Sequence, residues 1–166
     1  MILVSHSIIG TSLGILQSSP YASFFVALIS HYLTDMIPHY EYSIAGLKEN
    51  ADARETRKTF LRIMTDGILA VIVPVLIFYF GGYVNGWYDL IILLAAILGS
   101  VIPDAVQGVT LVFSRNRVLR AHQMMHDAIH HAISSDNMGI KRYPVLGISS
   151  QVILCLVFLA FGLYFG

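Results

Sequence analysis

Long apolar segments that are nearly free of charge dominate this sequence, and such segments exclude most ways in which a chain can fold. Charged residues make up 12% of its 166 residues, about half the share that is typical of soluble proteins. A helix needs about 20 mostly apolar residues to cross a bilayer. The composition therefore excludes a soluble globular domain, a disordered chain and a nucleic-acid-binding protein with a large basic excess. It predicts an integral membrane protein.

The apolar segments predict an all-α helical bundle, in which residues 1–166 form a single integral membrane domain. A histidine-rich polar segment, 114–142, is expected to form an amphipathic helix at the membrane surface. The single cysteine excludes an intrachain disulfide. The expected membrane spans number about five and cover residues 2–17, 21–37, 61–80, 87–102 and 144–165.

The basic residues predict how the bundle is oriented. With five spans, all ten Lys and Arg residues fall beside or between spans on one side of the membrane. Basic loops stay on the cytoplasmic side. We therefore expect a multi-pass protein with a cytoplasmic N-terminus and an external C-terminus. The two basic groups are Lys48, Arg54, Arg57, Lys58 and Arg62, and Arg115, Arg117, Arg120, Lys141 and Arg142.

A short internal similarity suggests that residues 1–40 and 61–113 are related helical hairpins. Val-Ser-His-Ser-Ile at 4–8 corresponds to Met-Thr-Asp-Gly-Ile at 64–68. The hairpins close on Ile-Pro-His at 37–39 and on Ile-Pro-Asp at 102–104. Such a repeat places four ionisable residues at equivalent depths on one face: His6, His39, Asp66 and Asp104.

Ionisable residues inside membrane spans are costly, and they usually mark a functional site. His31 and Asp35 lie one helical turn apart, and His39 continues the same row. They can bind a metal ion together, or they can satisfy each other inside a packed bundle. Asp66 and Asp104 lie near the ends of apolar runs, where a carboxylate either belongs to a functional site or caps a helix.

The strongest signal is a row of histidines at every fourth position. His122, His126 and His130 share one face of a helix, and His131 lies beside them. This spacing can chelate a metal from consecutive turns. The alternative is a pH-sensitive interfacial helix.

The predicted topology places these His and Asp side chains at the cytoplasmic face, although it was derived from the Lys and Arg residues alone. Imidazole and carboxylate ligands suit zinc, manganese or iron, with zinc or manganese favoured, and they are enough for two ions. Arg115, Arg117 and Arg120 either hold an anionic headgroup or are ordinary positive-inside residues. We assign Asp66 and His122 as the general base or acid, and the candidate metal ligands are His6, His31, Asp35, His39, Asp104, His126 and His130.

Three motifs resemble a family of membrane-bound metal-dependent hydrolases of the bacterial inner membrane. They are Ser-His-Ser-Ile-Ile-Gly at 5–10, Gly-Ser-Val-Ile-Pro-Asp at 99–104, and the His-x-x-x-His of 126–130. The resemblance implies a helical membrane bundle with a metal site that includes His6, Asp104, His126 and His130. The family's Pro-Asp-x-Asp-His is Pro-Asp-Ala-Val-Gln at 103–107 here. We expect His31, Asp35 and His39 to replace the missing ligands.

The sequence predicts a hydrolase that depends on a divalent metal and has a site open to the cytoplasm. Its expected substrate is a phosphoester, or a lipid-linked molecule taken from the membrane, and no nucleic-acid partner is expected. One alternative is a metal-ion or proton transporter that uses the same His and Asp residues. Another is a membrane scaffold in which the histidines are structural.

Overall fold

Helices are the only regular secondary structure in the residues that the computed structural model describes, which are 2–42, 45–47, 52–113, 115–133 and 144–166. These residues contain no strand. The order of elements is α1 (Leu3–Gly14), α2 (Pro20–Asp35), the 3-10 helix η1 (Ala45–Leu47), α3 (Ala53–Phe80), α4 (Trp87–Val112), α5 (Arg117–Ile133) and α6 (Pro144–Phe165). The all-α prediction is confirmed.

Local sequence signals explain where several helices begin and end. Pro20 occupies the first turn of α2, where its missing N–H has no intrahelical partner to lose. Asp52 caps α3 by accepting a hydrogen bond from the backbone N–H of Glu55 at 2.8 Å. After α3, Gly82 adopts φ +82°, a conformation that favours glycine. The expected helical segment 114–142 is observed as α5, and its part from 134 onward lies outside the described residues.

Three helices, α3, α4 and α6, are long and apolar enough to cross a membrane, which is fewer than the five spans that we expected. The difference lies in α1 and α2, which have 12 and 16 residues. At 1.5 Å per residue they extend about 18 and 24 Å, less than the hydrocarbon thickness of about 30 Å.

Both helices of the second hairpin are longer than predicted. Helix α3 starts at Ala53 rather than near residue 61, because its cap lies at Asp52. Helix α4 continues through Pro103 to Val112 instead of ending at residue 102. Proline is tolerated within a membrane helix where neighbouring groups satisfy the carbonyl that it frees. The extension carries Asp104 past the last apolar run without a break in the helix.

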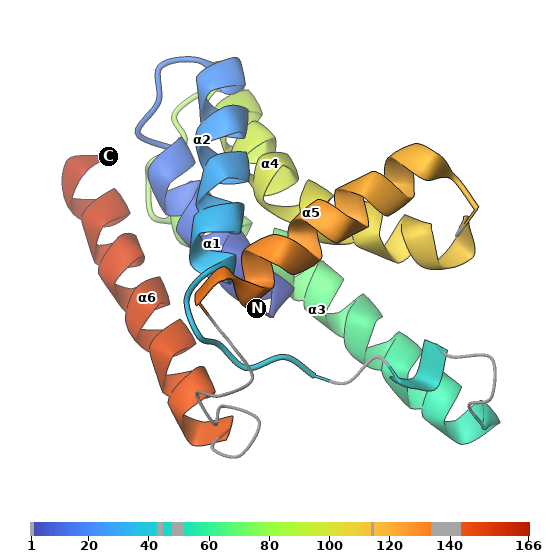
Figure 1. The fold of residues 1–166 in the computed structure, drawn as a ribbon. Helices are drawn as coiled ribbons and strands as arrows, with labels where there is room; N and C mark the ends of the chain where they lie inside the picture. The colour runs from blue at the N-terminus through green and yellow to red at the C-terminus, as the bar shows by residue number, and fades with distance from the viewer. Residues whose placement is uncertain (1, 43–44, 48–51, 114, 134–143) are drawn as a thin grey trace.

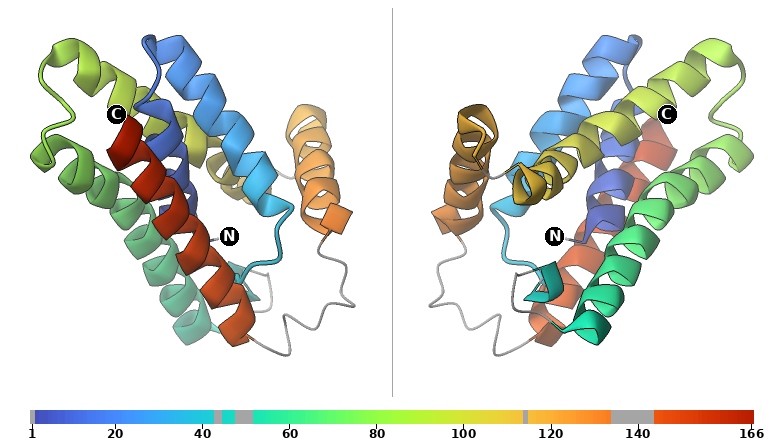
Figure 2. Two further views of the ribbon diagram at one scale, coloured as in Figure 1. Left: turned by 90° about the vertical axis from the view of Figure 1, so that its left-hand side faces the viewer. Right: turned by 90° about the vertical axis from the view of Figure 1, so that its right-hand side faces the viewer.

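Helices α1 and α2 pack tightly against α4 and form the centre of the molecule (Figure 2). A Cβ placed on Gly10 would lie 2.7 Å from the Cβ of Ser100, so this contact requires glycine. Ser23 of α2 donates a hydrogen bond to the carbonyl oxygen of Ile92 at 2.9 Å. Helix α6 covers α1, where Gly162 approaches the backbone of Ser12. Small residues allow this close approach, as they do in membrane bundles generally.

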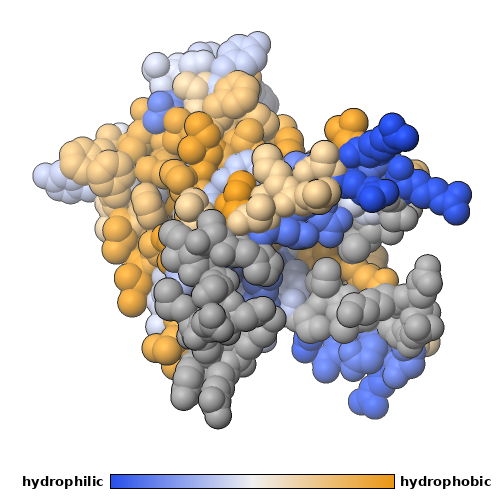
Figure 3. All heavy atoms as spheres, in the orientation of Figure 1, coloured by the Kyte–Doolittle hydropathy of each residue, from blue (hydrophilic) through white to orange (hydrophobic). Residues whose placement is uncertain are grey.

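The elements alternate in direction along the bundle (Figure 1). The α1–α2 turn, the start of α4 and the end of α6 lie toward one end, and the start of α3 lies at the other. Figure 3 shows apolar side chains over much of the visible surface and hydrophilic ones gathered near the start of α3 and the α4–α5 turn. Large apolar side chains such as Leu76, Leu98 and Leu156 are exposed. A bilayer explains their exposure.

Candidate metal centre

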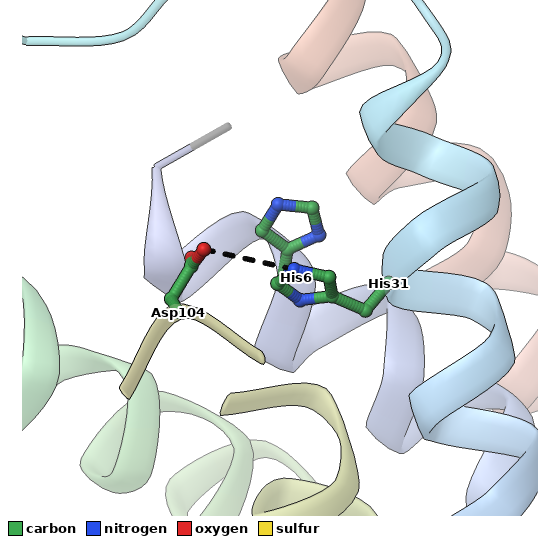
Figure 4. A group of neighbouring side chains, drawn as sticks. All are labelled: His6, His31 and Asp104. Carbon is green, nitrogen blue, oxygen red and sulfur yellow. Dashed lines mark ion pairs between the residues drawn. The ribbon is translucent and has the colours of Figure 1, made fainter. Parts of the chain in front are cut away.

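Four helices bring histidines and carboxylates together at one place. Helix α1 supplies His6, α2 supplies His31 and Asp35, α4 supplies Asp104, and α5 supplies His126 and His130. The side chains of His6, His31, Asp35 and His126 are almost completely buried. Figure 4 shows the rings of His6 and His31 side by side, with the carboxylate of Asp104 facing them. The residues come from distant parts of the sequence, so packing of the bundle creates the cluster.

His31, Asp35 and His126 have the mutual distances of a set of metal ligands, and Asp104 contacts both histidines. His31 Nε2, Asp35 Oδ2 and His126 Nε2 are separated by 3.1, 3.3 and 3.5 Å. Asp104 Oδ1 lies 3.7 Å from His31 Nε2 and 3.4 Å from His126 Nε2. Ligands about 2.0–2.2 Å from a tetrahedral zinc ion are about 3.3–3.6 Å apart. We call these four residues the central cluster, and the spacing of His31, Asp35 and His126 can hold one metal ion.

A second group of side chains adjoins the central cluster through Asp35. His130 Nε2 lies 3.3 Å from Asp35 Oδ2 and 3.5 Å from Glu41 Oε1. His39 Nε2 lies 3.1 Å from the same Glu41 oxygen. Ligand atoms of Asp35, His39 and His130 lie close enough together to hold an ion. On the other side of Asp35, His6 Nε2 is 2.9 Å from Oδ1.

Hydrogen bonds on the far side of three imidazoles fix which nitrogen faces the carboxylates. His31 Nδ1 lies 2.7 Å from the carbonyl oxygen of Ser100, and His39 Nδ1 lies 2.6 Å from that of Ile37. A carbonyl can only accept, so both Nδ1 atoms carry the proton. His6 Nδ1 lies 3.0 Å from Thr34 Oγ1, and that hydroxyl can donate its own proton to backbone carbonyls. In the neutral rings each Nε2 therefore directs a lone pair at a carboxylate.

Lone pairs that face carboxylate oxygens at about 3 Å repel unless a cation lies between them. Protons on two of the rings can supply that charge, because two imidazolium rings balance two carboxylates and leave no unpaired charge in a buried place. One divalent ion supplies the charge without protonating any ring. Histidines whose second nitrogen is held by a backbone carbonyl are typical of metal sites.

On α5, the electrostatics differ between neighbouring histidines. Burial lowers the pKa of His126, but hydrogen bonds to Asp104 and Asp35 outweigh burial and raise it to about 9. Burial and the nearby His126 lower the pKa of His122. His122 Nε2 makes a hydrogen bond of 3.1 Å with the Tyr32 hydroxyl, and its ring centroid lies 6.0 Å from that of His126. His122 therefore borders the central cluster.

Asp66 belongs to α3, and its side chain contacts the start of α1 rather than the clustered ligands. Its two carboxylate oxygens accept hydrogen bonds from the backbone N–H groups of Leu3 and Val4 at 2.9 and 3.0 Å. Tyr42 donates a third at 3.3 Å. A carboxylate there caps the helix and complements its dipole. A helix cap is one of the two roles that the sequence predicts for Asp66, but the helix that it caps lies about 60 residues away in the sequence. Its assignment as an acid or base stays a prediction.

Sequence reasoning missed Glu41, Thr34 and Ser100. Glu41 follows His39 by two residues, and that short polar spacing was an available signal. Thr34 and the carbonyl of Ser100 had none, because only the packing of α2 and α4 shows which backbone or hydroxyl group a ring meets. Arg115, Arg117 and Arg120 are exposed. Lys48, Lys141, Arg142 and the side chain of His131 lie outside the described residues.

Comparisons of the chain with protein-family models, with curated proteins and with solved structures give no match.

Proposed function

We propose that the protein is a membrane-embedded hydrolase that acts on a phosphoester and depends on a divalent metal ion held by the central cluster. The observation that carries the proposal is the set of distances from 3.1 to 3.7 Å among His31, Asp35, His126 and Asp104. The resemblance to metal-dependent hydrolases of the bacterial inner membrane points the same way.

The residues around the cluster have separate roles in this proposal. A divalent ion supplies positive charge for a phosphoryl oxygen and lowers the pKa of a bound water. Asp35 is the shared ligand, because it contacts both the central cluster and the His39–His130 group. His122 is the candidate for proton transfer, since its lowered pKa keeps it neutral. Asp66 is a positioning residue that fixes α1 and thereby His6.

The His39–His130 group provides for a second ion. With Glu41 it offers one carboxylate and two imidazoles besides Asp35. Two ions that share a carboxylate can hold both the attacking and the leaving oxygen of a phosphoester. Zinc and manganese suit this donor set.

The site lies near the cytoplasmic boundary of the membrane in this account. Asp35 is 15 residues beyond Pro20, and Asp104 is 17 beyond Trp87, so each lies about 22–26 Å from the far end of its helix. The hydrocarbon layer is about 30 Å thick. Basic residues such as Arg62 and Arg120 lie on the helices that enclose this end, which favours a cytoplasm-facing site in a bacterial inner membrane with the N-terminus inside.

Metal analysis of the detergent-purified protein tests the proposal. After loading with zinc or manganese and removal of excess ion, we expect about one to two ions per chain, together with hydrolysis of a phosphoester. Less than about 0.2 ion per chain would contradict it. The variant Asp89→Asn is a matched control, because Asp89 accepts a hydrogen bond from Asn85 at the opposite end of α4.

Transport is the rival function, and proteoliposomes distinguish it. Between Asp66 and Phe80, α3 carries no ionisable side chain except Tyr79, and α4 carries none between Asp89 and Asp104. The long helices thus offer no polar path toward the far side. Ion or proton uptake into proteoliposomes without hydrolysis would overturn the hydrolase and favour the transporter.

A further inference from the structure

An apolar cavity leads away from the metal centre between α3 and α4. Its volume is about 840 Å³, within the range of about 300–1,000 Å³ that holds organic ligands. Residues of α3 between Ile63 and Ile72 form one wall, and residues of α4 between Asp104 and Val109 form the other. Glu41 lies at its rim. We call this cavity the α3–α4 groove.

The groove is continuous with the proposed catalytic centre. Asp104 lines the groove and is also a member of the central cluster. Glu41 lines it as well and contacts His39 and His130. A molecule in the groove therefore has one end at the metal ligands and the other along α3.

Two glycines line the groove. A Cβ placed on Gly67 of α3 or on Gly108 of α4 would meet no atom within 4 Å. Gly10 shows the opposite behaviour, because its missing Cβ makes room for Ser100. Glycine within a helix costs up to about 1 kcal/mol relative to alanine. At Gly67 and Gly108 no packing contact within the described chain compensates for that cost. The open space beside each glycine lies in the groove.

Apolar side chains of the groove are exposed on helices that are fit to cross the membrane. Ile68 is 51% exposed, Ile72 46% and Val109 44%, and α3 and α4 both meet the requirements of a span. In a bilayer the side chains of Ile68 and Ile72 face hydrocarbon. The groove thus joins the acyl-chain layer to the metal ligands at the membrane boundary.

From these observations we infer that the α3–α4 groove binds the acyl chain of a phosphate-bearing membrane lipid, whose phosphate reaches the central cluster. The inference rests on the proposed function for the phosphate end, because a metal ion there attracts an anion. For the acyl-chain end, the inference rests on the apolar walls of the groove and on the two glycines. A lipid of this kind enters sideways from the bilayer, without leaving the membrane.

Photo-crosslinking of the full-length, metal-loaded protein in detergent micelles tests this inference. The probe is a phosphatidic acid with a diazirine on one acyl chain, and the labelled positions are mapped by mass spectrometry. We expect label on residues 63–72 and 104–109 to exceed label on the exposed apolar face of α6 by about tenfold, which corresponds to about 1.4 kcal/mol of preference. A diacylglycerol with the same chain should label the groove several-fold less.

Variants that fill the groove provide the second part of the test. Gly67→Leu and Gly108→Leu add bulk where nothing lies within 4 Å, so we expect folding and metal content to be kept and groove labelling to fall. Ala160→Leu adds the same bulk on the exposed face of α6, and it should leave the groove labelling unchanged.

The outcomes separate the groove from the proposed function, because labelling requires no turnover. Equal labelling of the groove and α6, or groove labelling that both glycine variants leave intact, would overturn the inference. Equal labelling by phosphatidic acid and diacylglycerol would overturn the selection of a phosphate-bearing lipid. Groove labelling without hydrolysis would overturn the hydrolase alone. Hydrolysis of a water-soluble phosphoester with an unlabelled groove would overturn the groove alone.

Discussion

The two helical hairpins of this protein share one topology but differ in which residues they bury and which they expose. The α1–α2 hairpin is short, and its helices bury mainly small and polar residues, among them His6, His31 and Asp35. The α3–α4 hairpin is long, and apolar side chains along both of its helices are exposed. The first hairpin carries most of the candidate ligands, and the second provides length and an apolar surface.

The contrast shows how a small membrane protein can bury polar groups. A lone polar residue in hydrocarbon is unfavourable, but α1 and α2 lie among α3, α4, α5 and α6. Hydroxyls and backbone carbonyls then satisfy the rings, as Ser100 does for His31. The long hairpin takes part at only a few points, chiefly Asp104 at the centre and Asp66 at the start of α1.

The largest expected effect comes from Asp35 in the short hairpin. Asp35→Asn weakens the ligand that contacts His6, His31, His126 and His130. We expect metal affinity to fall by at least about 100-fold, because removal of supporting groups around a ligand alone costs about 10–100-fold. Metal titration of the purified variant measures this. The control Asp89→Asn in the long hairpin should bind metal like the wild type; equal losses in both would refute the central role of Asp35.

The next effect contrasts a glycine from each hairpin. Gly10→Val forces side-chain atoms toward Ser100, which a Cβ would already approach to 2.7 Å, and overpacking of this kind costs about 1–3 kcal/mol. Gly67→Ala enters open space and should stabilise α3 by up to about 1 kcal/mol. Unfolding in detergent with increasing denaturant measures both changes. If Gly67→Ala destabilised the protein as much as Gly10→Val, the described packing would be wrong.

Asp66 tests whether the long hairpin positions the short one. Asp66→Asn weakens the cap on Leu3 and Val4, and we expect a loss of about 1–2 kcal/mol in the free energy of unfolding. The number of bound metal ions should stay unchanged. A variant that kept its stability but lost all turnover would instead show that Asp66 is an acid or base.

The last prediction is that one proton is released when metal binds. The pKa of His126 is raised to about 9 in the metal-free protein, so its ring is protonated at pH 7 and must lose that proton to become a ligand. Metal affinity should therefore rise between pH 6 and pH 9, by up to about tenfold per pH unit. Calorimetry in buffers of different ionisation enthalpy counts the proton. An affinity independent of pH would contradict this role of His126.

Much of the site could be predicted from the sequence, because the cost of placing ionisable residues in apolar segments and the spacing between those residues are visible there. His31 with Asp35, and His126 with His130, are each one helical turn apart, and ionisable residues in apolar segments are rarely accidental. The convergence of the two pairs on Asp104 depends on how α2, α4 and α5 pack. No local pattern contains that information.

The limits of the sequence prediction are clearest in the number of spans. The hydropathy of segments 2–17 and 21–37 predicts two membrane spans, because their apolar residues outnumber their polar ones. The structure shows helices of 12 and 16 residues whose polar residues face other helices. Composition cannot tell an apolar face toward lipid from a small-residue face toward a neighbouring helix. In the same way, Asp66 could be placed near a helix end, but its partner, the start of α1, could not be predicted.

Anomalous scattering from crystals of the metal-loaded protein tests the central claim most directly. Data collected on both sides of the zinc or manganese absorption edge locate the ion and identify its ligands together. We predict an anomalous peak bounded by His31, Asp35, His126 and Asp104, and a second peak, if two ions bind, beside His39 and His130. A well-ordered structure of fully loaded protein with no peak among these residues would contradict the account.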